Sequence, residues 1–272
     1  MRILFCGDIV GRSGREVVIK YIPHLKQKLQ LDCVIVNGEN AAHGFGINAT
    51  ICKELYQAGV HVITTGNHIW DQRDVIGYID KDPFLLRPLN FPPTAPGKGY
   101  TVYQTPKGQS VLVMNAMGRL FMDAIDDPFA AVDAVLKKMP LGAAVSAIVL
   151  DFHAEATSEK MSMAHFCDGR VSLVVGTHTH TPTADEQILD HGTACLTDAG
   201  MCGDYNSVVG MLKDAPIHRF TRKMPSERLS PAQGDGTLCG VYLETDDATG
   251  LALKVAPVRL GGRLSQTMPV IS

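Results

Sequence analysis

The sequence predicts an α/β fold with a largely parallel sheet, and three observations carry this prediction. Short apolar runs recur along the chain, and each ends at a polar or glycine-rich turn. Helical patterns separate the early runs, as in strand–helix–strand units with parallel strands. Residues 238–260 alternate apolar and polar positions around a turn at 246–250, as in a β-hairpin. A hairpin after a parallel half predicts two packed sheets rather than one open sheet.

The apolar runs are continuous rather than alternating, so we expect strands that are buried on both faces. They occupy residues 2–6, 33–37, 60–65, 110–115, 146–152, 172–175 and 194–197. Helices are expected at residues 15–30, 48–57, 71–79, 130–138 and 159–167. The proline-rich stretch at 90–99 predicts a surface loop that is too short to separate domains. We therefore expect a single domain over residues 1–272.

The composition is that of an ordinary globular protein, with 45% hydrophobic and 19% charged residues. A formal net charge of -3 argues against bulk attraction to duplex nucleic acid or to an anionic membrane. No signal peptide and no apolar run of about 18 residues is found, so we expect a soluble cytoplasmic protein. The seven cysteines form no CxxC pair, and Cys6, Cys33 and Cys195 lie in apolar runs, which predicts buried thiols.

Polar side chains follow five of the predicted strands. Each taken alone has an ordinary explanation as a helix cap, a turn residue or a satisfied core residue. In a parallel sheet, however, the carboxyl ends of the strands meet at one edge, where ligands bind. The residues expected to converge there are Asp8, Glu39, Asn40, Asn67, His68, His153, His178 and His180.

This set of side chains indicates a metal site. Carboxylate, amide oxygen and imidazole are the mixed oxygen and nitrogen donors that suit Mn, Fe or Zn, rather than calcium or a thiolate-bound ion. Seven donors, all of the set except His68, are too many for one tetrahedral ion but fit two ions that share a carboxylate. Two metals about 3.5–4 Å apart are a standard apparatus for hydrolysing a phosphate ester.

The segment GDIVGRSG raises the alternative of a nucleotide-binding loop. A P-loop needs four residues between its glycines and then a lysine, whereas three residues separate Gly7 from Gly11 and Arg12 follows. The glycines at 7, 11 and 14 do not match GxGxxG either. A dinucleotide-binding oxidoreductase is therefore disfavoured, and no organic cofactor is expected.

The order GD…GEN…GNH…H…GTHTH resembles the calcineurin-like metallophosphoesterase superfamily. Two departures from the superfamily pattern, Val10 in place of a histidine and Gly38-Glu39-Asn40 in place of a Gly-Asp motif, are similar to the YmdB-like branch of 2′,3′-cyclic nucleotide phosphodiesterases. The likeness continues through DFHAEATSEK, GRVSLVVGTHTHTPTADEQIL and TDAGMCGDYNSVVG, so it covers most of the chain.

The resemblance implies a four-layer α/β/β/α sandwich with the metal site at the C-terminal edge of the strands. It implies two transition-metal ions, with Fe, Mn and Zn left open, and hydrolysis of small phosphodiesters. Glu39 would be shared by both ions, and His68 would assist the leaving group. One ion would be held by Asp8, Glu39, Asn40 and His180, and the other by Glu39, Asn67, His153 and His178.

The mechanism expected from such a centre is in-line attack by a hydroxide that bridges the metals, while His68 protonates the departing ribose oxygen. Two aspartates that follow the apolar run at 194–197, Asp198 and Asp204, are expected either to orient the ligand histidines or simply to form turns. Candidates for contact with the substrate, with ordinary loop and cap roles as the alternative, are Arg12, Asn115, Thr157 and Ser158.

Two other functions stay open on the sequence. One is a phosphomonoesterase, since pocket shape is not readable from sequence. The other is a regulatory protein that keeps the fold and a weak phosphodiesterase activity. The expected partner is a small phosphodiester, probed most directly with cyclic nucleotides, and self-association into a homo-oligomer is left open because α/β enzymes of this size often associate.

Overall fold

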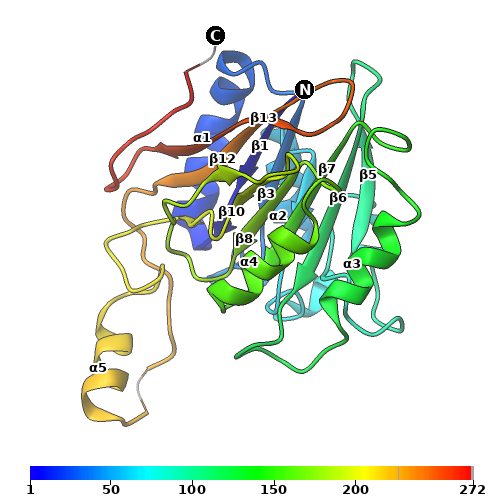
Figure 1. Ribbon diagram of the computed structural model, residues 1–272. Helices are drawn as coiled ribbons and strands as arrows, with labels where there is room; N and C mark the ends of the chain where they lie inside the picture. Colours follow the sequence, from blue (N-terminus) through cyan, green and yellow to red (C-terminus); the bar gives the residue numbers. More distant parts are fainter. Residues whose placement is uncertain (226, 271–272) are drawn as a thin grey trace.

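The computed structural model describes residues 1–225 and 227–270, whose strands form two large mixed sheets (Figure 1). The first sheet has the order β13-β12-β1-β3-β4. In it β1 (Arg2–Cys6), β3 (Cys33–Asn37) and β4 (Val62–Thr64) are parallel. The hairpin of β12 (Leu238–Thr245) and β13 (Ala252–Leu260) joins it antiparallel to β1, which confirms the predicted C-terminal hairpin.

The second sheet has the order β5-β6-β7-β8-β10-β9. Its parallel centre consists of β6 (Ser110–Met117), β7 (Ala147–His153), β8 (Leu173–Thr177) and β10 (Ala194–Leu196). Antiparallel edge strands flank it, β5 (Tyr100–Gln104) and β9 (Gln187–Ile188). A short parallel pair, β2 (Asp8–Ile9) with β11 (Met201–Cys202), lies beside the large sheets.

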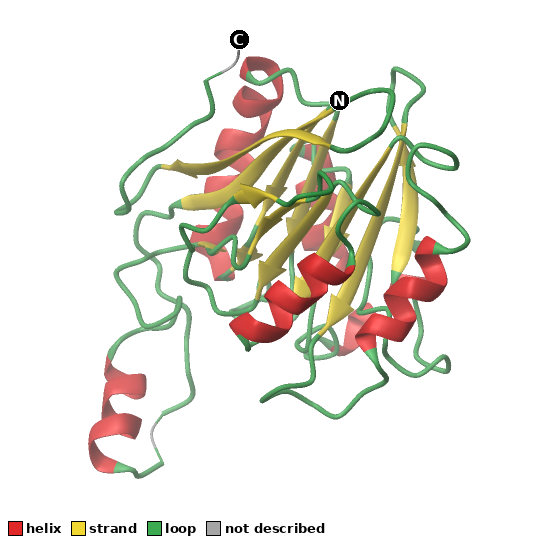
Figure 2. Cartoon of the chain, in the orientation of Figure 1, coloured by secondary structure: helices red, strands yellow, loops and turns green. Residues whose placement is uncertain are grey.

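Helices lie on the outer sides of the paired sheets (Figure 2). The first sheet packs its Leu4 face into one apolar core with α1 (Gly11–Lys28) and α2 (Ala49–Gln57). Phe5, on the opposite face because side chains alternate along a strand, packs in a second core with Val149 and Val175 of the other sheet. The outer face of that sheet packs in a third core with α3 (Pro128–Leu136) and α4 (Thr157–Phe166).

One sequence prediction about these elements is wrong. The segment 71–79 is no α-helix; two single 3-10 turns, η1 (Arg73–Val75) and η2 (Ile79–Lys81), lie there instead, because Gly77 disfavours a continuous helix between them. Two further elements, β5 and α5 (Asp214–Arg222), were not predicted, and α5 projects away from the two sheets (Figure 1). Only Pro216 is buried in α5, so no core-facing pattern announces this helix.

The burial of the other elements follows the sequence pattern. Cys6, Cys33 and Cys195 are buried free thiols, as predicted, and so are the other four cysteines. Within residues 1–225 and 227–270, no helix combines the length and the apolarity that a membrane crossing requires.

Candidate metal centre

The polar residues singled out in the sequence lie at the carboxyl ends of strands from both large sheets. In the first sheet, Asp8 follows β1, Glu39 and Asn40 follow β3, and Asn67 and His68 follow β4. In the second sheet, His153 is the last residue of β7, and His178 and His180 follow β8. Because the two sheets pack face to face, their parallel strands deliver these side chains to one common edge.

Donor atoms at this edge fall into two groups that could each hold an ion. Glu39, His153 and His178 form one group, and Asp8, Glu39 and His180 form the other, with the donor atoms of each group within 4.8 Å of one another. Glu39 belongs to both groups. These are the carboxylates and imidazoles that the family resemblance implies for each ion, while the amides Asn40 and Asn67 are not among them.

His153 Nε2 is the centre of the first group. It lies 3.0 Å from Asn67 Oδ1, 3.1 Å from Glu39 Oε1 and 3.1 Å from His178 Nδ1. Gly66 permits this crowding, because a Cβ there would lie 2.3 Å from the His153 ring and 2.4 Å from Glu39 Oε2. The backbone at Gly66, just after β4, therefore lies so close to His153 and Glu39 that no Cβ fits between them.

Two buried oxygens, one in the second group and one on the neighbouring Asn40, have no hydrogen-bond partner among the described residues. Asp8 and Asn40 are 0% and 3% exposed, and the Oδ1 atom of each is buried without a partner among the described residues. A buried oxygen without a partner is costly and requires an explanation. Two such oxygens at the strand edge that also carries His180 fit the donor set of a cation.

Burial and mutual charge shift the pKa values of this cluster. Burial disfavours the protonated form of His153, but the charge and hydrogen bond of Glu39 outweigh it and raise the pKa of His153 to about 9. Burial likewise opposes the ionisation of Glu39, yet His153 brings its pKa to about 2. Burial and the charge of His153 lower the pKa of His178 to about 3. Glu39 and His153 therefore form a buried ion pair within this cluster.

Each buried histidine has a partner on the nitrogen that faces away from the cluster. His153 Nδ1 lies 2.8 Å from Thr177 Oγ1, which in turn donates to Asp151 Oδ1 at 2.7 Å. His180 Nδ1 donates to the carbonyl oxygen of Val209 at 2.8 Å. In both cases Nε2 remains as the nitrogen for a ligand, and the partner fixes the tautomer and the ring orientation.

The loop that carries His178 and His180 has a strained backbone. The two residues have φ angles of 97° and 64°, in the left-handed region that side chains rarely adopt. Between them, Thr179 donates from its backbone N and from Oγ1 to Asp198 Oδ2, at 3.1 and 2.7 Å. This loop conformation directs His178 to one donor group and His180 to the other, although the two residues are only two positions apart.

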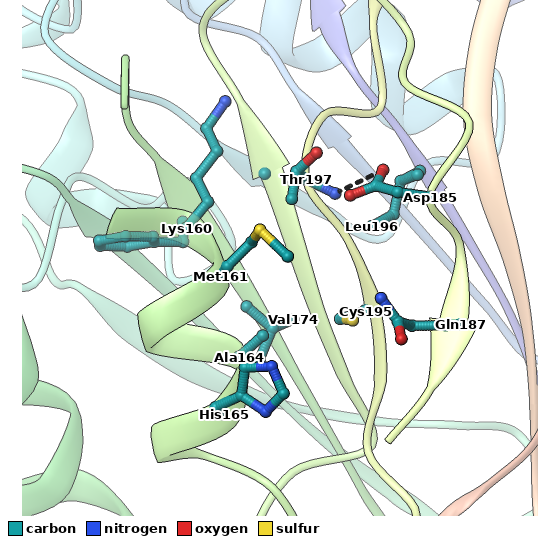
Figure 3. A pocket seen from close by; sticks show the side chains of 12 residues that line it. Lys160, Met161, Ala164, His165, Val174, Asp185, Gln187, Cys195, Leu196 and Thr197 are labelled. Carbon is teal, nitrogen blue, oxygen red and sulfur yellow. Dashed lines mark hydrogen bonds between the residues drawn. The ribbon is translucent and has the colours of Figure 1, made fainter. Parts of the chain in front are cut away.

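Asp198 is itself held by Lys160, whose Nζ lies 2.8 Å from the same oxygen. Figure 3 shows the Lys160 side chain leaving α4 and extending past the neighbouring strands. The small cavity lined by the side chains in Figure 3 measures about 10 Å³, roughly the space of one water molecule, so it is no substrate pocket.

His68 lies beside the cluster and has a partner of its own. Its Nδ1 is 2.8 Å from Asp71 Oδ2, and its ring makes an edge contact with Phe45 at 5.1 Å between centroids. Its backbone N donates to Glu39 Oε2 at 3.2 Å. The side chain is about 29% exposed, so it is partly open to solvent.

The remaining sequence candidates have mostly structural contacts. Asp198 orients the histidine loop, whereas Asp204 accepts from Asn206 N and Gly234 N and forms turns. Asn115 is buried and accepts from Thr65 N, and Arg12 pairs with Glu16 on the surface. Thr157 and Ser158 begin α4. Among the described residues, no hydrogen bond or ion pair joins these last four to the donor groups.

Several residues of the site were not found from the sequence. Asp151 carried a usable signal, because residues two apart on a strand share a face and Asp151 precedes His153 by two. Asp71 follows His68 by three, a spacing at which side chains meet across a turn. Lys160 and Thr177 gave no signal, since their partners are distant in sequence.

The fold and the site together define an α/β protein with a candidate metal centre at the carboxyl ends of its strands. The chain belongs to the YmdB-like protein family, whose model matches residues 4–258. It is 46% identical over 259 residues to the 2′,3′-cyclic-nucleotide 2′-phosphodiesterase of Bacillus subtilis (strain 168), covering 94% of this chain and 95% of that relative.

Two solved structures are similar over nearly the whole chain. A hypothetical protein from Thermus thermophilus has a TM-score of 0.90 and 38% identity, covering 97% of this chain and 100% of that one. A Mycoplasma pneumoniae protein described as a novel phosphatase has a TM-score of 0.89 and 33% identity, covering 96% of this chain and 93% of that one. The α/β architecture with mixed sheets is therefore shared with these proteins.

Proposed function

We propose that this protein is a metal-dependent phosphodiesterase that hydrolyses 2′,3′-cyclic nucleotides. The observation that carries the proposal is the pair of donor groups that share Glu39. The Bacillus subtilis relative, described as a 2′,3′-cyclic-nucleotide 2′-phosphodiesterase, supports the choice of substrate. By analogy, water would add to phosphorus, the bond to the 2′ oxygen would break, and a nucleoside 3′-phosphate would form.

The proposed centre holds two ions. Asp8, Glu39, Asn40 and His180 would hold one ion, and Glu39, Asn67, His153 and His178 the other. The unpartnered oxygens of Asp8 and Asn40 support this assignment, and the donor set suits Fe or Mn, with Zn as a third choice. When bound, such a pair would activate water for attack near neutral pH and would neutralise charge on the phosphoryl oxygens.

The chain's own residues supply the remaining chemistry. His68 is proposed to donate a proton from Nε2 to the departing 2′ oxygen, while Asp71 accepts from Nδ1 and keeps the ring in place. Thr177 and Val209 keep the ligand nitrogens of His153 and His180 directed at the ions. Asn67 and Asn40 contribute neutral oxygens, so they add ligands without adding negative charge that would repel a phosphodiester.

We further propose a domain organisation, a layer architecture and a cellular location for this protein. Residues 1–272 form one domain, and the packing of helices outside two sheets supports a four-layer α/β/β/α sandwich. The metal centre lies at the C-terminal edge of its strands. Cytoplasmic location is part of the same proposal, because seven buried free thiols fit a reducing compartment.

The testing experiment is turnover by metal-reconstituted protein on 2′,3′-cyclic AMP, 3′,5′-cyclic AMP and p-nitrophenyl phosphate. We expect the 2′,3′-cyclic ester to be preferred and its hydrolysis to stop when a chelator is added. Preference for the monoester would indicate a phosphomonoesterase instead. No turnover of any substrate by protein with two ions bound would overturn the proposal and favour a regulatory role.

A further inference from the structure

A cavity of about 490 Å³ adjoins the candidate metal centre on the side of His180. Its volume is in the range of small-molecule sites. The walls come from the loop after β8, the loop after β11 and the end of β13, so they are distant in sequence. The lining residues used below are His180, Pro182, Tyr205, Val209, Arg259 and Leu264.

His180 belongs to both the cavity and the donor group of Asp8 and Glu39. Its Nδ1 donates to the Val209 carbonyl oxygen at 2.8 Å, which leaves Nε2 for that donor group. The imidazole is therefore a wall common to the two spaces. A molecule whose phosphoryl group lies at the donor groups has to pass only one side chain to reach the cavity.

Val209 has a backbone that is costly for its residue type. Its φ is 45°, which is a true outlier for a β-branched side chain, and its side chain is 52% exposed. Reciprocal 2.9 Å hydrogen bonds between Val208 and Met211 maintain this turn. The conformation aims the carbonyl at His180 and leaves the apolar side chain at the cavity, and strain of this kind is concentrated at functional sites.

Arg259 supplies the charged side of the cavity. Its Nε donates to the Ser265 carbonyl oxygen at 3.1 Å, and its backbone pairs with Thr267. These contacts hold the guanidinium in position. The Tyr205 hydroxyl is occupied by the backbone of Met201 and leaves its ring as wall. A planar guanidinium among apolar walls suits a flat aromatic ring with hydrogen-bond acceptors at its edge.

We propose that this cavity is the subsite for the base of the cyclic nucleotide, with Arg259 as a specificity-determining residue. The inference rests on the proposed function, because it places the phosphodiester at the adjacent donor groups. Pro182, Val209 and Leu264 contact the face of the base. Arg259 stacks on it or donates to its ring acceptors.

The opposite flank of the centre offers the rival position for a base. There the loop after β6 begins at Gly118, whose N donates to the carbonyl oxygen of His153. Its Phe121 is 89% exposed and has a φ of 61°. That residue stands free in solvent rather than in a cavity, so it provides a clean comparison variant.

The test separates the base from the phosphodiester. Metal-loaded protein is assayed on 2′,3′-cyclic AMP and on glycerol 1,2-cyclic phosphate, a five-membered cyclic diester without a base. Arg259→Ala is expected to raise KM for the nucleotide roughly tenfold, the loss of one good contact, with kcat unchanged and with glycerol cyclic phosphate unaffected. Arg263→Ala, in the same C-terminal turn but outside the cavity lining, is the matched control and should leave both substrates unchanged.

A rise in KM with Phe121→Ala but not with Arg259→Ala would place the base on the other flank and overturn the inference. Equal KM values of the unaltered protein for both diesters would also overturn it, while leaving the proposed function intact. A second readout does not depend on turnover. Saturation-transfer NMR of adenosine with metal-free protein should give a signal that Arg263→Ala keeps and Arg259→Ala loses; a signal that persists in Arg259→Ala contradicts the inference.

Discussion

Lys160 Nζ lies 2.8 Å from Asp198 Oδ2, and the two side chains are only 3% and 1% exposed. The same oxygen accepts both hydrogen bonds from Thr179, the residue between His178 and His180. Asp198 Oδ1 accepts from Gly200 N at 2.8 Å. This buried ion pair therefore holds the strained loop of His178 and His180 in place through Thr179.

Removing one partner of this ion pair should destabilise the protein strongly. Lys160→Met leaves Asp198 as an uncompensated buried charge, and we expect a loss of about 3–5 kcal/mol in the free energy of unfolding. Urea denaturation measures it. The double variant Lys160→Met with Asp198→Asn removes both charges but keeps an acceptor for Thr179, so it should cost less than the single variant. A double variant that costs as much would show that the charge pair is not the cause.

His68→Ala should lower kcat for 2′,3′-cyclic AMP by about a hundredfold or more, because the departing ribose oxygen then leaves without a proton donor. The loss should be much smaller with bis(p-nitrophenyl) phosphate, whose leaving group needs no proton. Metal content should stay at two ions per chain, since His68 is not among the donor groups. Equal losses on both substrates would contradict the role in leaving-group protonation.

Most of the site could be predicted because its residues end strands. Buried strands are readable as apolar runs, and parallel strands bring their carboxyl ends together, so Asp8, Glu39 and His153 could be grouped without coordinates. The same reasoning found the C-terminal hairpin from its alternation. It failed on the segment 71–79, where apolar spacing suggested a helix that Gly77 and local turns replace.

The supporting contacts were harder to predict, because they depend on packing between distant elements. Lys160 meets Asp198 only when α4 lies along the second sheet, and Thr177 meets His153 across two paired strands. The positive φ angles of His178, His180 and Val209 could not be predicted from the residue types, because residues other than glycine rarely adopt such angles. The cavity beside His180 likewise depends on three loops whose paths no local pattern encodes.

Gly66→Ala should disrupt the centre although it replaces no proposed ligand. The added Cβ would lie 2.3 Å from the His153 ring and 2.4 Å from Glu39 Oε2, so the buried pair must move. We expect metal content to fall below one ion per chain and turnover to be lost. Gly77→Ala meets nothing within 4 Å and serves as the control. Full metal content in Gly66→Ala, measured by elemental analysis, would show that the donor groups do not require this close approach.

Asn40→Ala should remove one ion and leave the other. Asn40 Oδ1 is a buried oxygen without a partner among the described residues, and only the proposed ion with Asp8 and His180 uses it. Elemental analysis after dialysis should therefore give about one ion per chain in place of two. The matched variant Asn67→Ala should likewise retain one ion, at the other position. Two tightly held ions in Asn40→Ala would contradict the assignment of this amide.

The metal-free protein should become less stable as the pH falls through a window set by the pKa of His61. Its Nδ1 accepts from Val34 N at 2.9 Å, and its ring stacks on Tyr103 at 4.6 Å. Burial and the nearby charge of Lys26 lower the pKa of His61 to about 4, from a usual value near 6.5. Between these two values the unfolded chain binds a proton that the folded protein does not, so acid favours unfolding. The stabilisation is complete above pH 6.5 and is lost as the pH falls towards 4.

His61→Asn isolates this contribution, because the amide can accept from Val34 N but does not titrate. Urea denaturation of both proteins from about pH 7.5 to about pH 4.5, each without metal, removes the effect of ion release and cancels the titration of the metal ligands. We expect the advantage of the unaltered protein over His61→Asn to shrink steadily below pH 6.5, because only the unaltered protein has to resist protonation of this imidazole. A difference that stays constant over the whole range would mean that His61 titrates alike in the folded and unfolded chains.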